Sequence, residues 1–563
     1  MMFSRESEPD WWKSSVVYQV YPRSFYDTNG DGVGDLRGVI EKVPYLKSLG
    51  VDIVWLNPIF MTPNDDMGYD ISDYTKINPE FGAMEDFDEL LTTLHAAGLK
   101  LILDLVVNHT SDEHEWFVDA KSSRSSKYRD FYIWWPEEKG SPPERYSFFD
   151  SNGSAWEYDQ ATKSYYLHLF SKKQPDLNWD NPVVRKEIYR MMEYWFDKGI
   201  DGFRMDVITY ISKEIPFTEP IKGVELFDWE EFYSMGPKLH EYLQEMHDEV
   251  LSKYDIMTVA EGPGINPENV LPMIKDDGSE LNMAYHFDHT NMGLRPRRMW
   301  SDEARNMVEF KNINRRWMKV LERGGWIGTF LGNHDQPRMV TRWGNDSEAF
   351  RKKSSMLLNT YLLTMPGTPF CYMGDELGMT NPRFDDIADY RDIETLNWYQ
   401  MVLSEGGDLE KFMESHKITA RDNGRTPIQW DSTRNAGFSS CDPWLKMNEN
   451  FAEINVESQE SDPESCLNYF RKLVQIRKKY DALVHGDFQE HDEGHQAIYS
   501  YSRKHQDQRL LIILNFSDQT STIQLDRSFD SISLVSSNYI ECSLDNTGSV
   551  TVSPWQASIY QFN

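Results

Sequence analysis

The sequence predicts an α/β protein built on a closed (β/α)8 TIM barrel, with a subdomain inserted after the third strand and a C-terminal antiparallel β-sandwich. Eight short apolar runs alternate with longer segments of helical periodicity, and most of these runs are too apolar to leave one face in water. Two connectors are far longer than a single helix. From about residue 484 the pattern changes to alternating apolar and polar residues with polar turns, which is typical of antiparallel strands.

The eight predicted barrel strands are separated by seven helical or helix-containing connectors. The strands are residues 16–21, 52–58, 100–108, 202–207, 256–262, 281–287, 326–335 and 368–376. Runs this short cannot be assigned to strands by periodicity alone, so their order along the chain decides the assignment. Among the connectors, residues 84–98 and 183–199 have helical patterns, and the second ends at Gly199, a residue suited to a left-handed C-cap. The uncharged run from Ser354 to Gly374 is broken by polar residues, Pro and Gly, so we predict a helix, a turn and a strand there.

The connectors suggest where the chain divides. The barrel takes residues 1–109 and 181–483, with an extra insertion at about 377–455. Residues 110–180, rich in Ser, Tyr, Trp and Pro, should form a subdomain over the barrel mouth. Residues 484–563 should form the β-sandwich beside the barrel.

Composition excludes several classes of function. The chain has 91 acidic and 58 basic residues and a net charge of −33, so its surface should repel nucleic acids and anionic membranes. A neutral, hydroxyl-rich or cationic ligand remains compatible with that charge. The four cysteines form no CxxC pair or Cys/His cluster, which argues against a zinc site and a disulfide scaffold. Because no apolar signal segment is visible, we expect a cytoplasmic protein, and we leave open whether it is a monomer or a dimer.

Polar side chains gather where the predicted strands end. These residues are Asp104, Asn108, His109, Arg204, Asp206, Glu261, Asn333, His334 and Asp335. A single Asp at such a place is usually a helix N-cap or a solvated loop residue. Because the carboxyl ends of all barrel strands meet at one mouth, the repetition of this pattern predicts one cavity lined by several carboxylates.

Two carboxylates on either side of a glycosidic bond can hydrolyse it, one as a nucleophile and the other as a protonated acid. Arg204 lies two residues before Asp206 on the same strand face, and its permanent charge should keep Asp206 ionised. Glu261 has no cation beside it in the sequence and could hold a proton near neutral pH.

Six segments, in order, resemble the α-amylase superfamily (glycoside hydrolase family 13), and most closely its oligo-1,6-glucosidase, α-glucosidase and sucrose isomerase subfamily. The segments are DLVVNHTS, QPDLNWDNP, GFRMDV, VAEGPG, LGNHDQPR and GTPFCYMGDE, and they span nearly the whole chain. The resemblance implies that Asp206 is the nucleophile and Glu261 the general acid/base. It also implies that Asp335 is the carboxylate that stabilises the transition state.

The same resemblance implies a set of sugar-binding residues. They are Asp66, Tyr69, His109, Phe170, Gln174, Arg204, His334 and Arg421. Asp66 would hold outer hydroxyls of the terminal glucose, and Tyr69 would form a floor for the apolar face of the sugar ring. Phe149 could wall the same pocket, but ordinary packing under a loop explains it equally well.

The segment DTNGDGVGD predicts a cation-binding loop. Hard oxygen ligands would come from Asp27, Asn29, Asp31, Asp35 and the carbonyl of Val33. The spacing resembles the first nine positions of an EF-hand loop, but the twelfth position is Gly38, where an EF-hand has Glu. We therefore expect a lone structural Ca²⁺ loop, with Mg²⁺ as an alternative occupant.

We expect a retaining exo-α-glucosidase that removes terminal α-1,6-linked glucose, with α-1,4-linked glucose as a second linkage, from short oligosaccharides such as isomaltose. Exo action follows from the long insertion, which should make a pocket. In the resembling subfamily, Val at the position of Val207 goes with α-1,6 linkages and Thr with α-1,4 linkages. Ala260, Gly262 and Gly332 depart from residues common in relatives, so the order of substrate preference stays open.

Three other functions are alternatives to this hydrolase. A sucrose isomerase or other transglucosidase shares the chemistry, but an Arg-rich loop is expected after the NHD segment, and only Arg338 and Arg342 occur there. A trehalose-6-phosphate hydrolase would need a basic cluster near the second sugar, which the sequence does not show. A glucosidase-like subunit without catalysis does not fit, because the three carboxylates are complete and no membrane anchor is visible.

Overall fold

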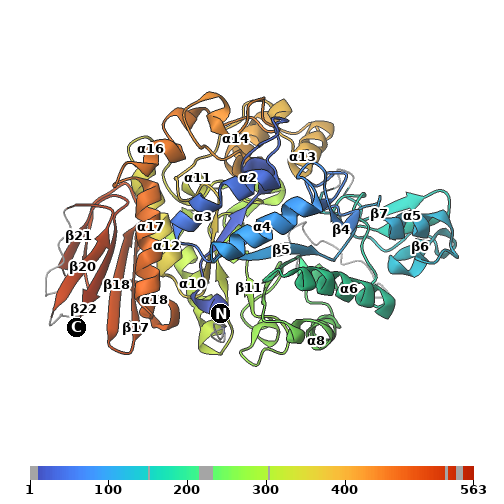
Figure 1. The fold of residues 1–563 in the computed structure, drawn as a ribbon, viewed down its shortest axis with the longest axis horizontal. Coiled ribbons are helices and arrows are strands. Elements are labelled where there is room, and N and C mark those ends of the chain that lie inside the picture. The colour runs from blue at the N-terminus through green and yellow to red at the C-terminus, as the bar shows by residue number, and fades with distance from the viewer. Residues whose placement is uncertain are drawn as a thin grey trace.

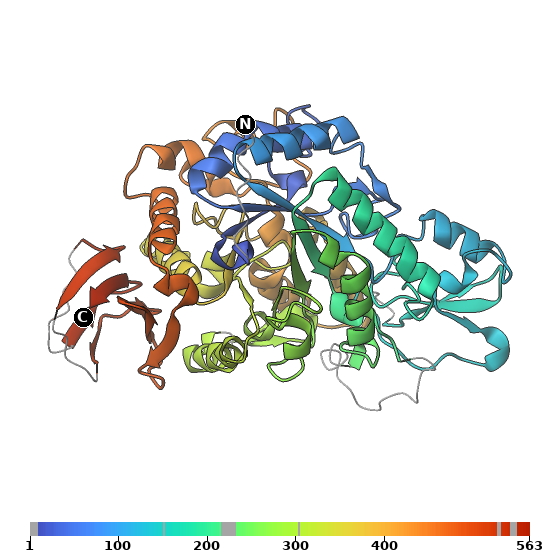
Figure 2. The same cartoon turned by 60° about the horizontal axis from the view of Figure 1, so that its bottom comes forward.

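A computed structural model describes residues 10–149, 153–214, 232–301, 305–525, 531–540 and 549–562. The molecule is elongated, with the barrel at its centre (Figure 1). The segment inserted between β5 and α6 lies at one end and the C-terminal strands at the other, and the turned view in Figure 2 shows the same arrangement.

All eight predicted barrel strands are present, in one parallel sheet. They are β1 (Val17–Val20), β2 (Ile53–Leu56), β5 (Lys100–Val106), β9 (Gly202–Asp206), β10 (Met257–Glu261), β11 (Met283–Tyr285), β14 (Gly328–Thr329) and β15 (Thr368–Tyr372). The strand order is β11-β10-β9-β5-β2-β1-β15-β14. A parallel bridge between Ala284 and Ile327 joins the two ends of this sheet, so the barrel closes. The predicted TIM barrel is confirmed.

Helices follow the strands and cover the outside of the barrel (Figure 1). They include α2 (Leu36–Glu41), α3 (Val43–Leu49), α4 (Met84–Ala96), α6 (Pro182–Lys198), α8 (Leu239–Glu249), α10 (Met307–Glu322), α12 (Arg351–Thr364) and α17 (Cys466–Lys479). The predicted C-cap of α6 is Gly199, with a φ of 106°, a conformation that glycine adopts at little cost. The run from Ser354 to Gly374 forms most of α12, a turn and β15, as predicted. In the part of the chain that the structure describes, no helix is both long and apolar enough to cross a membrane.

The alternation of side chains along the strands places the polar site. Ile102 and Val259 belong to an apolar cluster inside the lower part of the barrel. Two residues further on, Asp104 and Glu261 point to the same side of their strands, because side chains in a strand repeat with a period of two. Apolar side chains therefore fill the barrel towards the N-terminal ends of its strands, and charged side chains occupy the mouth at the C-terminal ends.

Two insertions follow barrel strands. The first contains α5 (Glu115–Ser122) and the strands β6 (Trp134–Pro136), β7 (Trp156–Asp159) and β8 (Ser164–Leu167), which form an antiparallel sheet in the order β6-β8-β7. Bridges from His109 to Asp176 and from Tyr132 to Leu177 tie the two ends of this insertion together. The second insertion follows β15 and contains α13 (Ile393–Ser404), α14 (Leu409–Thr419), α15 (Asp422–Arg425) and α16 (Val456–Glu460).

The C-terminal part is an antiparallel β-sandwich, as predicted. One sheet has the order β16-β17-β18-β22-β20, from Asp487–His491, Ile498–His505, Gln508–Asn515, Ala557–Phe562 and Ile532–Ser537. The other pairs β19 (Ser521–Gln524) with β21 (Ser549–Val552). Leu511 and Ile523 belong to the apolar layer between the sheets, whereas Ile512 faces the main core that includes the barrel helices. We keep the division at residues 110, 180 and 483 as our proposal for the domain limits.

Candidate active site

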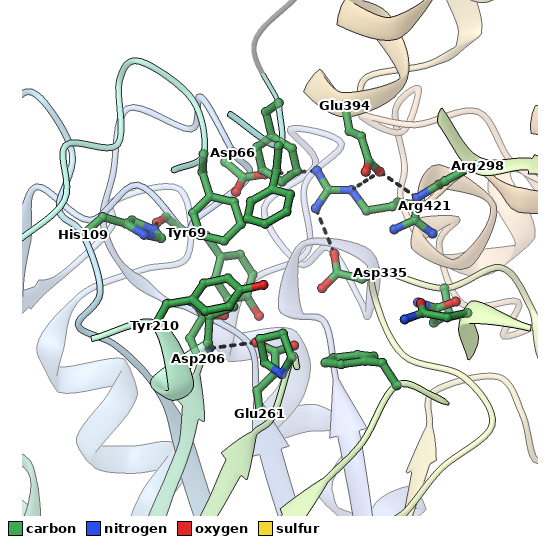
Figure 3. Close-up of a pocket in the computed structure, with 18 of the residues that line it drawn as sticks. Asp66, Tyr69, His109, Asp206, Tyr210, Glu261, Arg298, Asp335, Glu394 and Arg421 are labelled. Atoms are coloured by element: carbon green, nitrogen blue, oxygen red, sulfur yellow. Dashed lines mark hydrogen bonds and ion pairs between the residues drawn. The ribbon is translucent and has the colours of Figure 1, made fainter. Parts of the chain in front are cut away.

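A pocket of about 220 Å³ opens at the C-terminal ends of the barrel strands (Figure 3). The residues that line it are Asp66, Tyr69, His109, Phe148, Phe149, Phe170, Asp206, Val207, Tyr210, Glu261, Pro263, Phe287, Asn291, Arg298, Asp335, Gln336, Glu394, Trp398 and Arg421. All three predicted catalytic carboxylates are among them. Arg204, Gln174 and His334 lie directly behind this lining, where they contact the residues that form it.

Arg204 lies at the base of the pocket and contacts both Asp206 and Glu261, and also Asp104 behind them. Its Nη1 lies 2.6 Å from Asp206 Oδ1 and 2.7 Å from Asp104 Oδ1, while Nη2 contacts Glu261 Oε1. Its Nε donates to the Tyr285 hydroxyl at 2.7 Å. Glu261 has no cation beside it in the sequence, but in the folded barrel Arg204 is its neighbour. One guanidinium group contacts both carboxyls, so they stand close together.

Burial raises the pKa of Asp206 well above its usual range, although Arg204 acts in the opposite direction and Glu261 adds to the rise. Burial also raises the pKa of Glu261; Arg204 offsets part of that rise and Asp335 adds to it. The charge of Arg204 was predicted to keep Asp206 ionised, but burial and the neighbouring Glu261 both raise the pKa of Asp206 against it. Two adjacent buried carboxyls hold one proton between them, because ionising both would place like charges side by side.

Val207 follows Asp206 and has a left-handed backbone, with φ 34° and ψ 40°. This conformation is costly for a β-branched residue and usually persists only where its surroundings impose it. Here the N–H of Val207 donates to Glu261 Oε2 at 2.9 Å, and its side chain lines the pocket. The residue that we linked to substrate preference thus also holds the carboxyl of Glu261, the predicted acid/base, in place.

Asp335 faces the pocket from the opposite side. His334 Nε2 lies 3.0 Å from Asp335 Oδ2, and Arg421 and Arg425 contact Oδ1 at 3.0 and 2.9 Å. Burial would raise the pKa of Asp335, but the hydrogen bond from His334 and the charges of Arg421 and Arg425 outweigh burial and hold that pKa well below its usual range. Asp335 is therefore a permanent negative charge, suited to stabilising a positively charged transition state.

Asp66 and Arg421 lie together in the upper part of the pocket (Figure 3). Arg421 Nη2 is 3.3 Å from Asp66 Oδ1, and Gln174 Nε2 donates to Asp66 Oδ2 at 3.0 Å. Burial raises the pKa of Asp66 to about 7, with Arg421 acting against the rise. The structure thus brings these three predicted sugar-binding residues into one group.

Two histidines, a tyrosine and a phenylalanine complete the predicted set. The rings of Tyr69 and His334 are stacked, 5.1 Å apart and within 7° of parallel. Burial lowers the pKa of His109 and of His334 to about 4, so both rings are neutral at pH 7. His334 has both ring nitrogens engaged, by Asp335 and by Gln19, so it acts on the pocket through Asp335. The ring centres of Phe170 and His109 are 5.2 Å apart, and Phe170 lines the wall of the pocket.

Comparison with protein families identifies the chain. The model of the α-amylase catalytic domain matches residues 19–486, and that of the C-terminal domain of the α-amylase SusG matches residues 498–559. The chain belongs to the α-amylase family. The match to this catalytic domain and the full-length likeness to oligo-1,6-glucosidases show that it is a glycoside hydrolase.

Three relatives are informative. The chain is 48% identical to the oligo-1,6-glucosidase of Parageobacillus thermoglucosidasius over 556 residues, which cover 98% of this chain and 99% of that enzyme. It is 46% identical to the trehalose-6-phosphate hydrolase of Bacillus subtilis (strain 168) over 91% of each chain. The structure of a mutant isomaltulose synthase from Erwinia rhapontici NX5 with sucrose has a TM-score of 0.94 at 41% identity and covers 99% of both chains.

Several lining residues of this α-amylase family member were not predicted from the sequence. Arg298 Nε pairs with Glu394 Oε2 at 2.8 Å, and Trp398 lies one helical turn beyond Glu394. Tyr210 lines the wall near Val207. Phe149, which the sequence left open, lines the pocket, and the Arg421 guanidinium lies 4.8 Å from the centre of its ring. All five lie in connectors, where no strand register indicates which side chains face the mouth.

Arg338 and Arg342 do not form the basic loop of the alternative hypothesis. Both are buried and donate to backbone carbonyls, Arg338 to Met373 and Thr426, and Arg342 to Met292. Neither lines the pocket. These two arginines support the fold around the site.

The loop predicted to bind calcium is held by its own hydrogen bonds. The Asp27 carboxylate accepts three backbone N–H groups of the loop and the hydroxyl of Ser439. Asp35 accepts backbone N–H groups and caps α2, and Asn29 Nδ2 donates to Asp31 Oδ2 at 3.0 Å. In the described ranges, no three His, Cys, Asp or Glu side chains are grouped as metal ligands. The ligand types suit a hard cation, but these carboxylates already have donors, so calcium stays a prediction.

Proposed function

We propose that this chain is a retaining exo-α-glucosidase that releases glucose from terminal α-1,6 linkages of short oligosaccharides such as isomaltose. The observation that carries the proposal is the contact of one buried arginine, Arg204, with both Asp206 and Glu261. Retention requires two carboxyls about 5–5.5 Å apart, whereas inversion needs room for a water molecule between the sugar and the base. Full-length likeness to curated oligo-1,6-glucosidases supports the choice of linkage.

The shared proton of the carboxyl pair fits the first half of the reaction. With the proton on Glu261, an ionised Asp206 oxygen attacks the anomeric carbon while the bond to the leaving oxygen breaks. Glu261 gives its proton to that oxygen, and a covalent glycosyl-enzyme forms. Asp335, held ionised by Arg421 and Arg425, stabilises the positive charge that develops on the sugar.

In the second half, Glu261 removes a proton from water, and the hydroxyl attacks the anomeric carbon of the glycosyl-enzyme. The bond to Asp206 breaks, glucose leaves with its original anomeric configuration, and Glu261 holds the proton again. The N–H of Val207 favours the ionised form of Glu261 and so supports this base step.

Contacts between the two insertions support exo action. Asn397 of α13 donates to the carbonyl of Phe149 at 2.8 Å, and Arg421 lies against the ring of Phe149. These contacts connect the insertion that follows β15 to the subdomain of residues 110–180, on the side of the pocket where Asp66 lies. A chain continuing beyond the terminal glucose on that side would have to break them, so only an end unit fits.

The charges around the pocket favour a neutral substrate over a sugar phosphate. Five carboxylates line the pocket, against two arginines, Arg298 and Arg421. Arg298 is paired with Glu394, and the neighbouring Arg297 is paired with Glu405 at 2.7 Å. No unpaired cation in the described lining is available for a phosphate dianion. A trehalose-6-phosphate hydrolase is therefore less well supported than a hydrolase of neutral glucosides.

The test is a panel of isomaltose, maltose, sucrose, trehalose and trehalose 6-phosphate, with all products resolved by chromatography. We expect glucose from isomaltose with the highest kcat/KM. An isomerase would instead convert sucrose into an isomeric disaccharide, because fructose would intercept the glycosyl-enzyme before water does. Asp206→Asn, inactive on every substrate, is the control for contaminating glucosidases.

We also infer a structural Ca²⁺ at the loop of Asp27 and a cytoplasmic location. The loop offers hard oxygen donors of the kind that calcium prefers. Cys371, Cys441 and Cys466 are free thiols in the described chain, which supports a reducing compartment. Elemental analysis of the purified protein tests the first inference, and cell fractionation tests the second.

A further inference from the structure

Asp392 lies directly behind the pocket and takes no part in its lining. It is the N-cap residue of α13, and its side chain is completely buried. A buried carboxylate is costly unless charged or polar partners surround it, so its partners indicate what it does.

The carboxylate of Asp392 accepts from Arg421 and from the first turn of α13, where the backbone N–H of Glu394 donates to Oδ1 at 3.4 Å. Oδ1 accepts from Arg421 Nε at 3.0 Å and Nη2 at 2.5 Å, and lies 3.7 Å from Arg425 Nη1. Oδ2 accepts from the backbone N–H of Thr395 at 3.2 Å and from its hydroxyl at 2.9 Å. One carboxylate therefore joins Arg421 to the first turn of α13.

Both of the joined parts face the substrate. Arg421 contacts Asp66 and Asp335, which both line the pocket (Figure 3). The first two turns of α13 carry Glu394 and Trp398, which line the outer part. The two parts come from distant segments of the second insertion, and Asp392 connects them through side-chain contacts.

We propose that Asp392 is a positioning residue that fixes Arg421 relative to α13 and thereby sets the affinity of the pocket for a glucose unit. This inference rests on the proposed function only in taking a glucosyl unit as the ligand. Asp392 touches no substrate and takes no part in bond cleavage.

The contacts predict how substrate binding and catalysis would respond. Asp66 has Arg421 as its ion-pair partner, at 3.3 Å. Asp335 keeps Arg425 at 2.9 Å and His334 at 3.0 Å when Arg421 is displaced. Loosening Arg421 should therefore disturb the group that holds sugar hydroxyls more than the carboxylate that stabilises the transition state. The expected result is a change mainly in KM, with a smaller change in kcat.

The test is Asp392→Asn, which keeps the size of the side chain. The amide cannot satisfy the site in either orientation, because its NH₂ group must face either Arg421 or the donors of Thr395. We expect KM for the preferred substrate and the dissociation constant for glucose to rise about tenfold, the effect of losing a hydrogen bond to a charged group. We expect kcat to fall by less than about threefold. Glucose binding is measured by calorimetry on the full-length protein.

Asp408→Asn is the matched control, because Asp408 caps the neighbouring helix α14 through the backbone N–H of Lys411 and is exposed. Asp392→Ser is a second variant that keeps a capping oxygen while removing the charge. A lower melting temperature with unchanged KM and unchanged glucose affinity would show a purely structural role and overturn the inference. Failure of both Asp392 variants to fold would overturn it too. If the wild-type enzyme hydrolysed no glucoside, the proposed function would fail while glucose binding would still test Asp392.

Discussion

The exchange of Val207 for Thr tests how this enzyme would distinguish α-1,6 from α-1,4 linkages. Val207 lines the pocket immediately after Asp206, and its backbone N–H holds Glu261 at 2.9 Å. Thr has the same branching at Cβ, so it should tolerate the left-handed backbone at φ 34° as well as Val does. The exchange therefore replaces one methyl group in the pocket wall by a hydroxyl and changes little else.

The size of the effect follows from that single hydroxyl. We expect that in the wild type the sugar beyond the scissile bond of an α-1,4 substrate would meet the apolar side chain of Val207, which leaves a hydroxyl of that sugar unpaired. The longer α-1,6 bond should carry the second ring past Val207. A gained or lost polar contact of this kind is worth about 1–3 kcal/mol, so the ratio of kcat/KM values should shift about ten- to a hundredfold towards maltose.

The assay is kcat/KM on isomaltose and maltose for the wild type, Val207→Thr and Val207→Ala. The Ala variant removes bulk without adding a hydroxyl, so it separates the steric effect from the polar effect. The melting temperature of Val207→Thr should stay close to that of the wild type. A wild type that prefers maltose, or a Thr variant with an unchanged ratio, would refute this role for Val207.

Three further predictions follow from the site and from the loop. Asp206→Asn should abolish turnover on every substrate because it removes the nucleophile. The melting temperature should stay within a few degrees of the wild type because the exchange conserves volume. A kcat above roughly one percent of the wild-type value would contradict the role of Asp206. The acid limb of kcat/KM against pH should lie well above about 4, the value of an ordinary carboxyl, because burial raises the pKa of Asp206 and the nucleophile must be ionised; a limb near 4 would contradict this. Chelation of calcium should lower the melting temperature by mass action without stopping turnover at low temperature, and the reverse pattern would exclude a structural metal.

The sequence was sufficient for the residues whose position a strand fixes. Arg204 and Asp206 lie two residues apart in β9, so the period of the strand places both at the mouth. The barrel brings β9 and β10 side by side, and the end of β10 then places Glu261 next to Asp206. Asp335, which follows β14, arrives at the same mouth because every barrel strand points the same way.

The sequence was not sufficient where a loop or a long insertion supplies the residue. Glu394, Trp398 and Asp392 belong to the insertion after β15, where no strand end marks the direction of a side chain. Val207 has a left-handed backbone and donates its N–H to Glu261, a contact that only the folded barrel creates. The contact of Arg204 with Glu261 was missed for a different reason: both residues lie on strands, but they are far apart in sequence and only the pairing of β9 with β10 brings them together.

The anomeric configuration of the first product is the most direct test of the proposed retaining exo-glucosidase. Proton NMR can follow isomaltose hydrolysis within the first minutes, before mutarotation mixes the two anomers of the released glucose. Asp206 and Glu261 contact the same guanidinium group, so they stand close together, as a retaining mechanism requires. We therefore predict that the glucose from the non-reducing end appears as the α-anomer. Release of β-glucose from that end, or no glucose at all from isomaltose, would contradict it.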